Sequence, residues 1–167
     1  MTTAIPMRAT AELVAAAYLR TLVTAYDTAV GAVLQAPDPD THKVTWGNVG
    51  FIQTSSVGGA INPDVPMRRS VVSLDVWAAN PTPSKRPPWN RAFSLAELIV
   101  AATFDTPDHV TQAVVSLPTG YPDARVTEFT ALTEPARRPS DPADYARVGF
   151  DVAISWHGLG TTWTITP

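Results

Sequence analysis

The 167-residue chain contains no cysteine. That absence excludes disulfides, thiolate metal sites and cysteine nucleophiles, and it fits assembly in a reducing cytosol. Cationic residues are also few, because 12 lysines and arginines stand against 15 aspartates and glutamates and the formal net charge is −3. Without a basic excess, the sequence does not favour tight nucleic-acid binding through phosphate contacts.

Long apolar runs are missing as well. Residues 11–23 are rich in Ala, Leu and Val, but Glu12 and Arg20 interrupt them. The stretch is also too short to span a bilayer. We therefore predict no membrane span and no targeting segment, and we interpret this stretch as an amphipathic helix that Thr10 caps at its start.

Motifs that carry chemistry are absent from the sequence. His42, His109 and His157 lie far apart, and none has a companion at the spacing that metal sites use. Gly58-Gly59 and the segment Gly158–Gly160 lack the strand–loop–helix context of phosphate-binding loops, so we expect turns there. There is no nucleophile elbow, zincin motif or Walker sequence. The sequence therefore predicts no catalytic residue, no metal, no cofactor and no enzyme.

Proline, by contrast, is abundant. The 16 prolines among 167 residues are about twice the usual share. They gather between the periodic segments, which predicts long, stiff, ordered loops. No repeat or break in composition divides the chain, so we expect a single domain over residues 1–167.

Alternation of apolar and polar residues predicts the strands. The clearest run is 147–157, and residues 71–79 form a second strand. A shorter strand over 50–59 is expected to end in the Gly-Gly turn, and 111–118 and 125–134 are expected to flank a turn. With helices near 11–24 and 89–104, this order predicts an α+β domain: a mostly antiparallel sheet with two helices packed on one face, and long proline-rich loops.

The start of the second helix has two interpretations. It lies in the segment SKRPPWNRAFSLAELI, residues 84–99. Pro88 is pre-set for a first helical position and would start the helix near Trp89. Alternatively, Ser94 and Glu97 form a capping box, flanked by apolar residues spaced as a hydrophobic staple. The sequence does not separate these two.

The same helix is apolar over about twice the width that a surface helix needs. It therefore requires two partner surfaces. Both are internal if they are the sheet and the N-terminal helix; the other interpretation is that one belongs to a neighbouring subunit. In either case we expect Trp89 to anchor the start of the helix.

Charged residues gather as opposed spots on the stiff loops. Solvated loop charge is one interpretation, and docking edges are the other, because rigid loops lose little entropy on binding. The candidate interface residues are Trp89, Arg91, Arg68, Arg69, Lys85, Arg86, Arg137, Arg138, Asp141 and Asp144.

The connection Thr133–Arg147 is predicted to be a docking arm. It joins two strands that should pair as neighbours, yet it is much longer than a usual hairpin loop. Three prolines stiffen it, and it carries both signs of charge. A solvated loop that tolerates insertion is the alternative.

Most of the chain resembles a known family of structural proteins. The stretches that carry the resemblance are GFIQTSSVGGAINPDVPMRRSVVSLDVWA (50–78), RPPW (86–89) and ARVTEFTALTEPARRPSDPADYARVGFDVAISW (124–156). Together they are similar to tail terminator proteins of long-tailed actinobacteriophages.

The resemblance implies a small α+β subunit that forms a ring, usually of six copies, at the head-proximal end of the tail. Such a ring binds the tail tube protein, stops growth of the tube and presents a surface to the head–tail connector or stopper protein. It needs no cofactor, and it belongs to the virion after assembly in the host cytoplasm. A ring of acidic subunits would let DNA pass through its lumen without specific binding.

Two other functions stay open. The chain could be a head-completion or connector protein of the same virion neck, which only the identity of its partner would distinguish. It could also be a small ligand-binding domain or enzyme, which would need a deep pocket with convergent polar groups.

Overall fold

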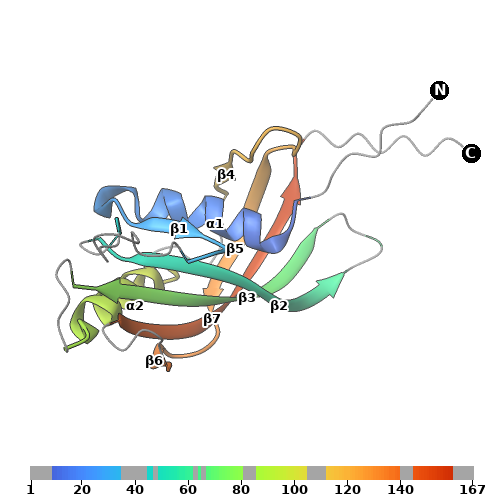
Figure 1. The fold of residues 1–167 in the computed structure, drawn as a ribbon. Helices are drawn as coiled ribbons and strands as arrows, with labels where there is room; N and C mark the ends of the chain where they lie inside the picture. The colour runs from blue at the N-terminus through green and yellow to red at the C-terminus, as the bar shows by residue number, and fades with distance from the viewer. Residues whose placement is uncertain are drawn as a thin grey trace, which may run out of the picture.

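Two helices and a seven-stranded sheet make up the fold in this computed structural model, which describes residues 9–34, 45–46, 49–61, 64, 67–80, 86–104, 112–139 and 145–159 (Figure 1). The helices are α1 (Ala11–Leu22) and α2 (Trp89–Ala102), and the 3-10 helix η1 (Thr24–Tyr26) follows α1. The strands are β1 (Ala29–Gly31), β2 (Phe51–Ile61), β3 (Arg68–Ala79), β4 (Val114–Val115), β5 (Ala124–Ala131), β6 (Ala136–Arg137) and β7 (Tyr145–Gly158).

The sheet is mostly antiparallel, as the sequence predicts. Its strand order is β1-β2-β3-β7-β5-β4, and β6 pairs with β7. Among the strands of the described residues, only β1 and β2 run parallel to each other. The two longest strands, β3 and β7, pair from Arg68 opposite Trp156 to Ala79 opposite Tyr145. This pair forms the spine on which the rest of the molecule is built.

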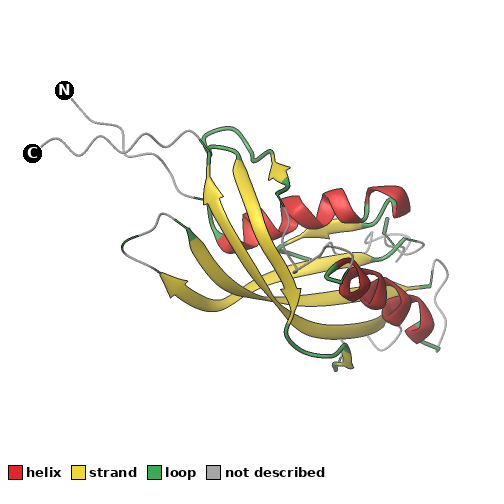
Figure 2. Ribbon diagram, turned by 180° about the vertical axis from the view of Figure 1, so that it is seen from behind, coloured by secondary structure: helices red, strands yellow, loops and turns green. Residues whose placement is uncertain are grey.

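Both helices cover one face of the sheet (Figure 2). Alternate residues of β3 and β7 point into the core under them and are fully buried, among them Val72, Leu74, Val76, Val148 and Ile154. α1 packs on β1, β2 and β3, whereas α2 packs on β3 and β7. The predicted α+β architecture with two helices on one face is thereby confirmed.

The start of each helix has a local cause. At α1, the Leu13 backbone N–H donates to Thr10 Oγ1 over 3.3 Å, which confirms the predicted cap. α2 begins at Trp89, directly after Pro88. This selects the start at Trp89 and makes the capping-box interpretation wrong, because Ser94 lies exposed in the second turn of the helix.

Two turn predictions need correction. Gly58 and Gly59 are not a turn: β2 runs through them to Ile61, with a bulge after Ser56. Gly59 lies so close to the β3 backbone at Arg69 that any Cβ would collide with it, which explains a glycine inside a strand. Gly158 is likewise no turn residue but the last of β7.

One strand is shorter than the sequence predicts, and two further strands were not predicted. Of the predicted strand 111–118, only Val114 and Val115 pair, as β4. The short strands β1 and β6 were not predicted, because two or three residues are too few for an alternation pattern to be visible.

Candidate functional site

The apolar arc of α2 is only partly covered within the subunit. Ala92, Leu95, Ala96 and Ile99 are buried against the sheet. A second strip along one side of the helix is half-buried, and Phe104, just beyond the helix end, is 68% exposed. This strip consists of Trp89, Phe93 and Val100. The sheet is thus one of the two expected partners, and α1 shares the β3 surface with α2.

Trp89 lies at the start of this strip, and the Arg137 guanidinium packs over its ring. The guanidinium carbon of Arg137, which belongs to β6, lies 4.7 Å from the Trp89 ring centroid. A cation–π contact of this kind contributes about 0.5–1 kcal/mol at an exposed site. It joins two predicted interface residues that are far apart in the sequence, and it ties β6 to α2.

The arm Thr133–Arg147 is not the long loop that the sequence predicts. The Arg138 N–H donates to the Arg147 carbonyl over 2.9 Å, and the Asp151 N–H donates to Thr133 Oγ1 over 2.9 Å. With β6 between these contacts, residues 133–138 run along β7 as part of the sheet. The predicted residues Asp141 and Asp144 lie outside the described part of the chain, as does Lys85.

An ion cluster on the helix-free face of the sheet holds this segment. Asp75 of β3 is buried, and its Oδ2 accepts from Arg147 Nη2 at 2.6 Å. Arg138 Nη1 lies 3.5 Å from the other Asp75 oxygen, and Arg138 Nη2 lies 3.8 Å from Asp151 Oδ1. The Arg138 side chain crosses Gly149, where a Cβ would collide with it. The Arg138 side chain therefore pairs with carboxylates of β3 and β7 in its own subunit.

Asp75 is not among the residues that the sequence predicts for the site. Its only signal was a carboxylate on the polar side of an otherwise apolar strand. A buried carboxylate has to be paired, so such a position predicts a cationic partner. The sequence does not show that the cationic partners of Asp75 are Arg138 and Arg147.

The remaining predicted cations divide between the two ends of β3. Arg68 and Arg69 begin the strand: the Arg68 guanidinium lies 5.7 Å from the Trp156 ring centroid, and Arg69 Nη2 lies 3.0 Å from Glu128 Oε1. Arg91 is at the other end, where its Nη1 donates to the Ala79 carbonyl over 3.0 Å. The two groups of cations lie at opposite ends of β3, a strand of twelve residues, and are therefore up to about 36 Å apart.

Arg86 belongs to the second of these groups. It is exposed and lies three residues before the start of α2, and its carbonyl accepts from Asn80 Nδ2 over 2.8 Å. The structure therefore brings Arg86, Trp89, Arg91 and Arg137 to the α2 end of the sheet and leaves Arg68 and Arg69 at the far end. The sequence alone did not indicate which of these residues lie at which end of the sheet.

The hairpin formed by β2 and β3 exposes apolar side chains at its far end. Ile61 is 74% exposed and Val57 is 62% exposed, and Met67 is also exposed. β1 pairs with only the first three residues of β2. The Ser56 N–H, further along that edge, donates to Glu12 Oε1 over 2.7 Å. Figure 1 shows this hairpin reaching away from α2.

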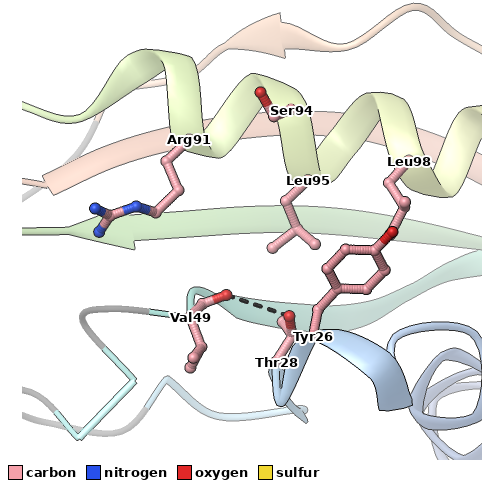
Figure 3. Close-up of a pocket in the computed structure, with 7 residues that line it drawn as sticks. All are labelled: Tyr26, Thr28, Val49, Arg91, Ser94, Leu95 and Leu98. Carbon is pink, nitrogen blue, oxygen red and sulfur yellow. Dashed lines mark hydrogen bonds between the residues drawn. The ribbon is translucent and has the colours of Figure 1, made fainter.

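A pocket of about 260 Å³ lies at the other flank of α2 (Figure 3). We call it the Tyr26 pocket, and its lining residues are Tyr26, Thr28, Val49, Arg91, Ser94, Leu95 and Leu98. At its floor, Thr28 Oγ1 donates to the Val49 carbonyl over 3.2 Å. Tyr26 and Arg91 add polar groups to this lining, whereas the Ser94 hydroxyl points away from Tyr26 and Thr28 (Figure 3).

The described residues contain no group of three or more His, Asp or Glu side chains that could hold a metal ion. The histidines fit this finding: His157 is half-buried at the end of β7, and His42 and His109 lie outside the described residues. Neither α1 nor α2 is long and apolar enough to cross a membrane, in the part of the chain that the structure describes.

Comparison with known proteins gives distant likeness in structure alone. No protein-family model matches the chain, and no curated protein matches it either. Among solved structures, a chain of the virion of a native gene transfer agent particle is similar, with a TM-score of 0.44 and 16% sequence identity. The match covers 88% of this chain and 96% of the other.

Proposed function

We propose that the protein is a structural virion subunit that forms a closed ring, by hypothesis a hexamer, at the end of a phage tail tube. The observation that carries the proposal is the half-covered apolar strip of α2, together with exposed apolar residues at the opposite end of β3. Two different apolar surfaces on one subunit suit a head-to-tail contact, which closes into a ring when the rotation allows.

A ring of this kind explains how tube growth can stop. A tube grows because each added ring regenerates the surface to which it bound, and a terminator binds that surface without regenerating it. The sequence resemblance to tail terminators supports this role. The partners are then further copies of the chain, the tail tube protein and the head–tail connector or stopper protein, with DNA passing through the lumen of a ring of acidic subunits without specific binding.

A head-completion or connector protein of the same neck has the same physical requirements. Such a protein would bind portal-side rings instead of the tail tube. Incubating the purified protein with isolated tail tubes and with isolated portal rings distinguishes the two. We expect electron micrographs to show it capping the tubes.

The Tyr26 pocket gives no support to a small-molecule function, although a second, more polar pocket of about 350 Å³ lies where the start of α1 faces β2 and β3. At about 260 Å³ the Tyr26 pocket is smaller than the usual range of ligand sites, which is about 300–1,000 Å³. Its Arg91 guanidinium already donates to a backbone carbonyl, and its Thr28 hydroxyl does the same. The pocket thus lacks the convergent polar set that a ligand-binding domain or an enzyme would need.

Native mass spectrometry of the purified protein tests the ring. We expect one closed stoichiometry to dominate as the concentration rises. A subunit that is monomeric both alone and in purified particles would contradict the proposal.

We also propose that residues 139–144, with the predicted Asp141 and Asp144, contact a neighbouring protein in the particle. Replacing them by a two-residue turn while keeping Arg138 and Arg147 tests this. We expect a folded subunit whose rings no longer join tail to head. Full-length, DNA-filled particles from the shortened protein would show that this segment is dispensable.

A further inference from the structure

We infer that Glu12 closes the free edge of β2 against pairing with the same edge of a second copy of the chain. The inference goes beyond the proposed ring and does not depend on it. It concerns the backbone of residues 56–61, which we call the β2 edge, and the carboxylate that holds the first N–H group of this stretch.

The β2 edge is unpaired on its outer side. β1 pairs with β2 only at Phe51, Ile52 and Gln53, and in the part of the chain that the structure describes no other strand lies on that side. Every residue from Ser56 to Ile61 is exposed, and a space of about 350 Å³ lies between this stretch and the start of α1. Unpaired N–H and C=O groups at a sheet edge are a template on which another strand can add.

The side chains of the β2 edge increase this tendency. Val57 and Ile61 are β-branched and are 62% and 74% exposed, so an added strand would bury them against its own side chains. Gly58 and Gly59 lie between them and offer no side chains that would fix one register. A strand of this composition can pair without specificity, which is the liability that sheet edges have to control.

Glu12 contacts the edge at its first N–H group. Its Oε1 accepts from the Ser56 N–H over 2.7 Å, and a hydrogen bond to a charged acceptor is stronger than one to a strand carbonyl. Because this N–H bonds to Glu12, it points away from β3 and is the first donor that an added strand would meet. Such a strand has to displace the carboxylate, and its own carbonyl oxygens are repelled by the negative charge. The bulge after Ser56 bends the edge at the same point.

The start of α1 keeps this carboxylate in place. Glu12 lies in the first turn of the helix, directly after the capped residues, because Thr10 accepts from the Leu13 N–H. The helix dipole favours an acidic side chain at that position. The Glu12 carboxylate is therefore held beside the edge by the helix rather than by β2 itself.

The cations nearest in the sheet are engaged on other strands. The Arg68 guanidinium lies over Trp156 of β7, and Arg69 pairs with Glu128 of β5. Both arginines thus reach across β3, away from the outer side of β2. Glu12 can remain bonded to Ser56 without a competing ion pair from these two side chains.

A second copy of the chain is the partner that an open β2 edge would take. Two copies of one strand can pair antiparallel about a two-fold axis, which gives a closed dimer. The sequence from Ser56 to Ile61 has no charged residue that would oppose such pairing. A subunit that assembles head to tail has no use for this dimer, so a closed edge keeps copies available for heterologous contacts.

The variant Glu12→Ala tests the inference. It removes the acceptor at Ser56 and leaves a strong helix former in α1. In native mass spectrometry we expect dimers at a concentration at least tenfold lower than for the unchanged protein. Hydrogen exchange of the Ser56 amide should become faster in the dilute variant, where the edge is open, and slow again as dimers form.

Thr10→Ala is the matched control, because it weakens the start of α1 and leaves the Glu12 carboxylate in the chain. We expect it to dimerise no more than the unchanged protein. Adding Val57→Lys to Glu12→Ala should remove the dimers, since lysine on an edge strand opposes pairing. If Glu12→Ala dimerises no more than Thr10→Ala, or if its dimers survive the lysine, the inference is wrong. Dimers and rings differ in mass, so this result is independent of whether the proposed ring forms.

Discussion

The two ends of β3 use the same pair of residues, arginine over tryptophan, in different surroundings. At the hairpin end, Arg68 covers Trp156, which sits opposite it in the β3–β7 ladder and is buried. At the α2 end, Arg137 covers Trp89, which is half-buried. The first pair joins strands that already share backbone hydrogen bonds, whereas the second joins a helix to an edge segment.

The difference shows how similar contacts have different structural roles. Truncating the Arg68 side chain would leave the backbone hydrogen bonds between β3 and β7 intact. The role of this side chain is therefore limited to covering the Trp156 ring. The α2 end depends more on side chains: Arg137, Arg138 and Asp75 hold β6, which contributes only two paired residues of its own. We therefore expect the hairpin end to fail through loss of core packing and the α2 end through loss of polar contacts.

The largest effect is expected for Trp156→Ala at the hairpin end. Removing a buried tryptophan side chain should lower the free energy of unfolding by about 3–5 kcal/mol. Trp156→Phe is the matched control, because the Trp156 indole N–H has no hydrogen-bond partner among the described residues. We expect a much smaller loss for it in urea denaturation. If Trp156→Phe lowers the free energy of unfolding as much as Trp156→Ala does, the indole N–H has a hydrogen-bond partner in solution.

At the α2 end, Asp75→Ala should have the next largest effect. It removes a buried carboxylate and leaves Arg147 and Arg138 without their shared partner. Breaking such a cluster costs about 3 kcal/mol, at the low end of the range for buried pairs because both arginines are about one-third exposed.

Asp151→Asn is the control for that change. Asp151 is more exposed and lies 3.8 Å from Arg138, so its substitution should cost less than about 1 kcal/mol. Thermal unfolding of the three proteins measures the difference. Similar losses for both variants would mean that burial of Asp75 is not what makes the cluster important.

The sequence predicted the long strands and the helices better than the contacts between distant segments, although it placed a turn at Gly58-Gly59, inside the β2–β3 hairpin. β3 and β7 alternate over many residues, so their existence and facing followed from the pattern. The Thr10 cap followed from its side chain and position alone. These features are local, and local chemistry is what a single sequence displays.

Features of the α2 end depend on contacts between distant segments. Nothing near Arg138 indicates that its side chain crosses Gly149 to reach Asp75. The Tyr26 pocket likewise forms from α2 and from the segment after α1, which are more than sixty residues apart. The sequence could only indicate that α2 needs a second packing partner. The pocket beside α2 becomes apparent only in the folded chain, in which these distant segments are brought together.

Trp89→Ala is expected to cost less than the tryptophan change at the hairpin end. Trp89 is half-buried and packs beside the core, so its loss should lower the free energy of unfolding by about 1–2 kcal/mol. Ring formation should be affected more than folding, since the α2 strip is the surface proposed for assembly. A melting temperature that falls as far as that of Trp156→Ala would mean that the residue is core.

The smallest expected effect is the coupling between Arg137 and Trp89, and it tests the comparison most directly. A double-mutant cycle with Arg137→Ala and Trp89→Ala should give a coupling of about 0.5–1 kcal/mol in urea denaturation. The same cycle for Arg68 and Trp156 should give less, because the guanidinium there is further from the ring, at 5.7 Å instead of 4.7 Å.

Arg137→Lys separates charge from shape in this contact. A planar guanidinium stacks on a ring face, whereas an ammonium is a compact and strongly hydrated charge. We expect lysine to recover less than half of the coupling at Trp89. If lysine restores all of it, or if the Arg68 cycle gives the larger value, the side chains of the α2 end do not join β6 to the helix in the way that the 4.7 Å contact indicates.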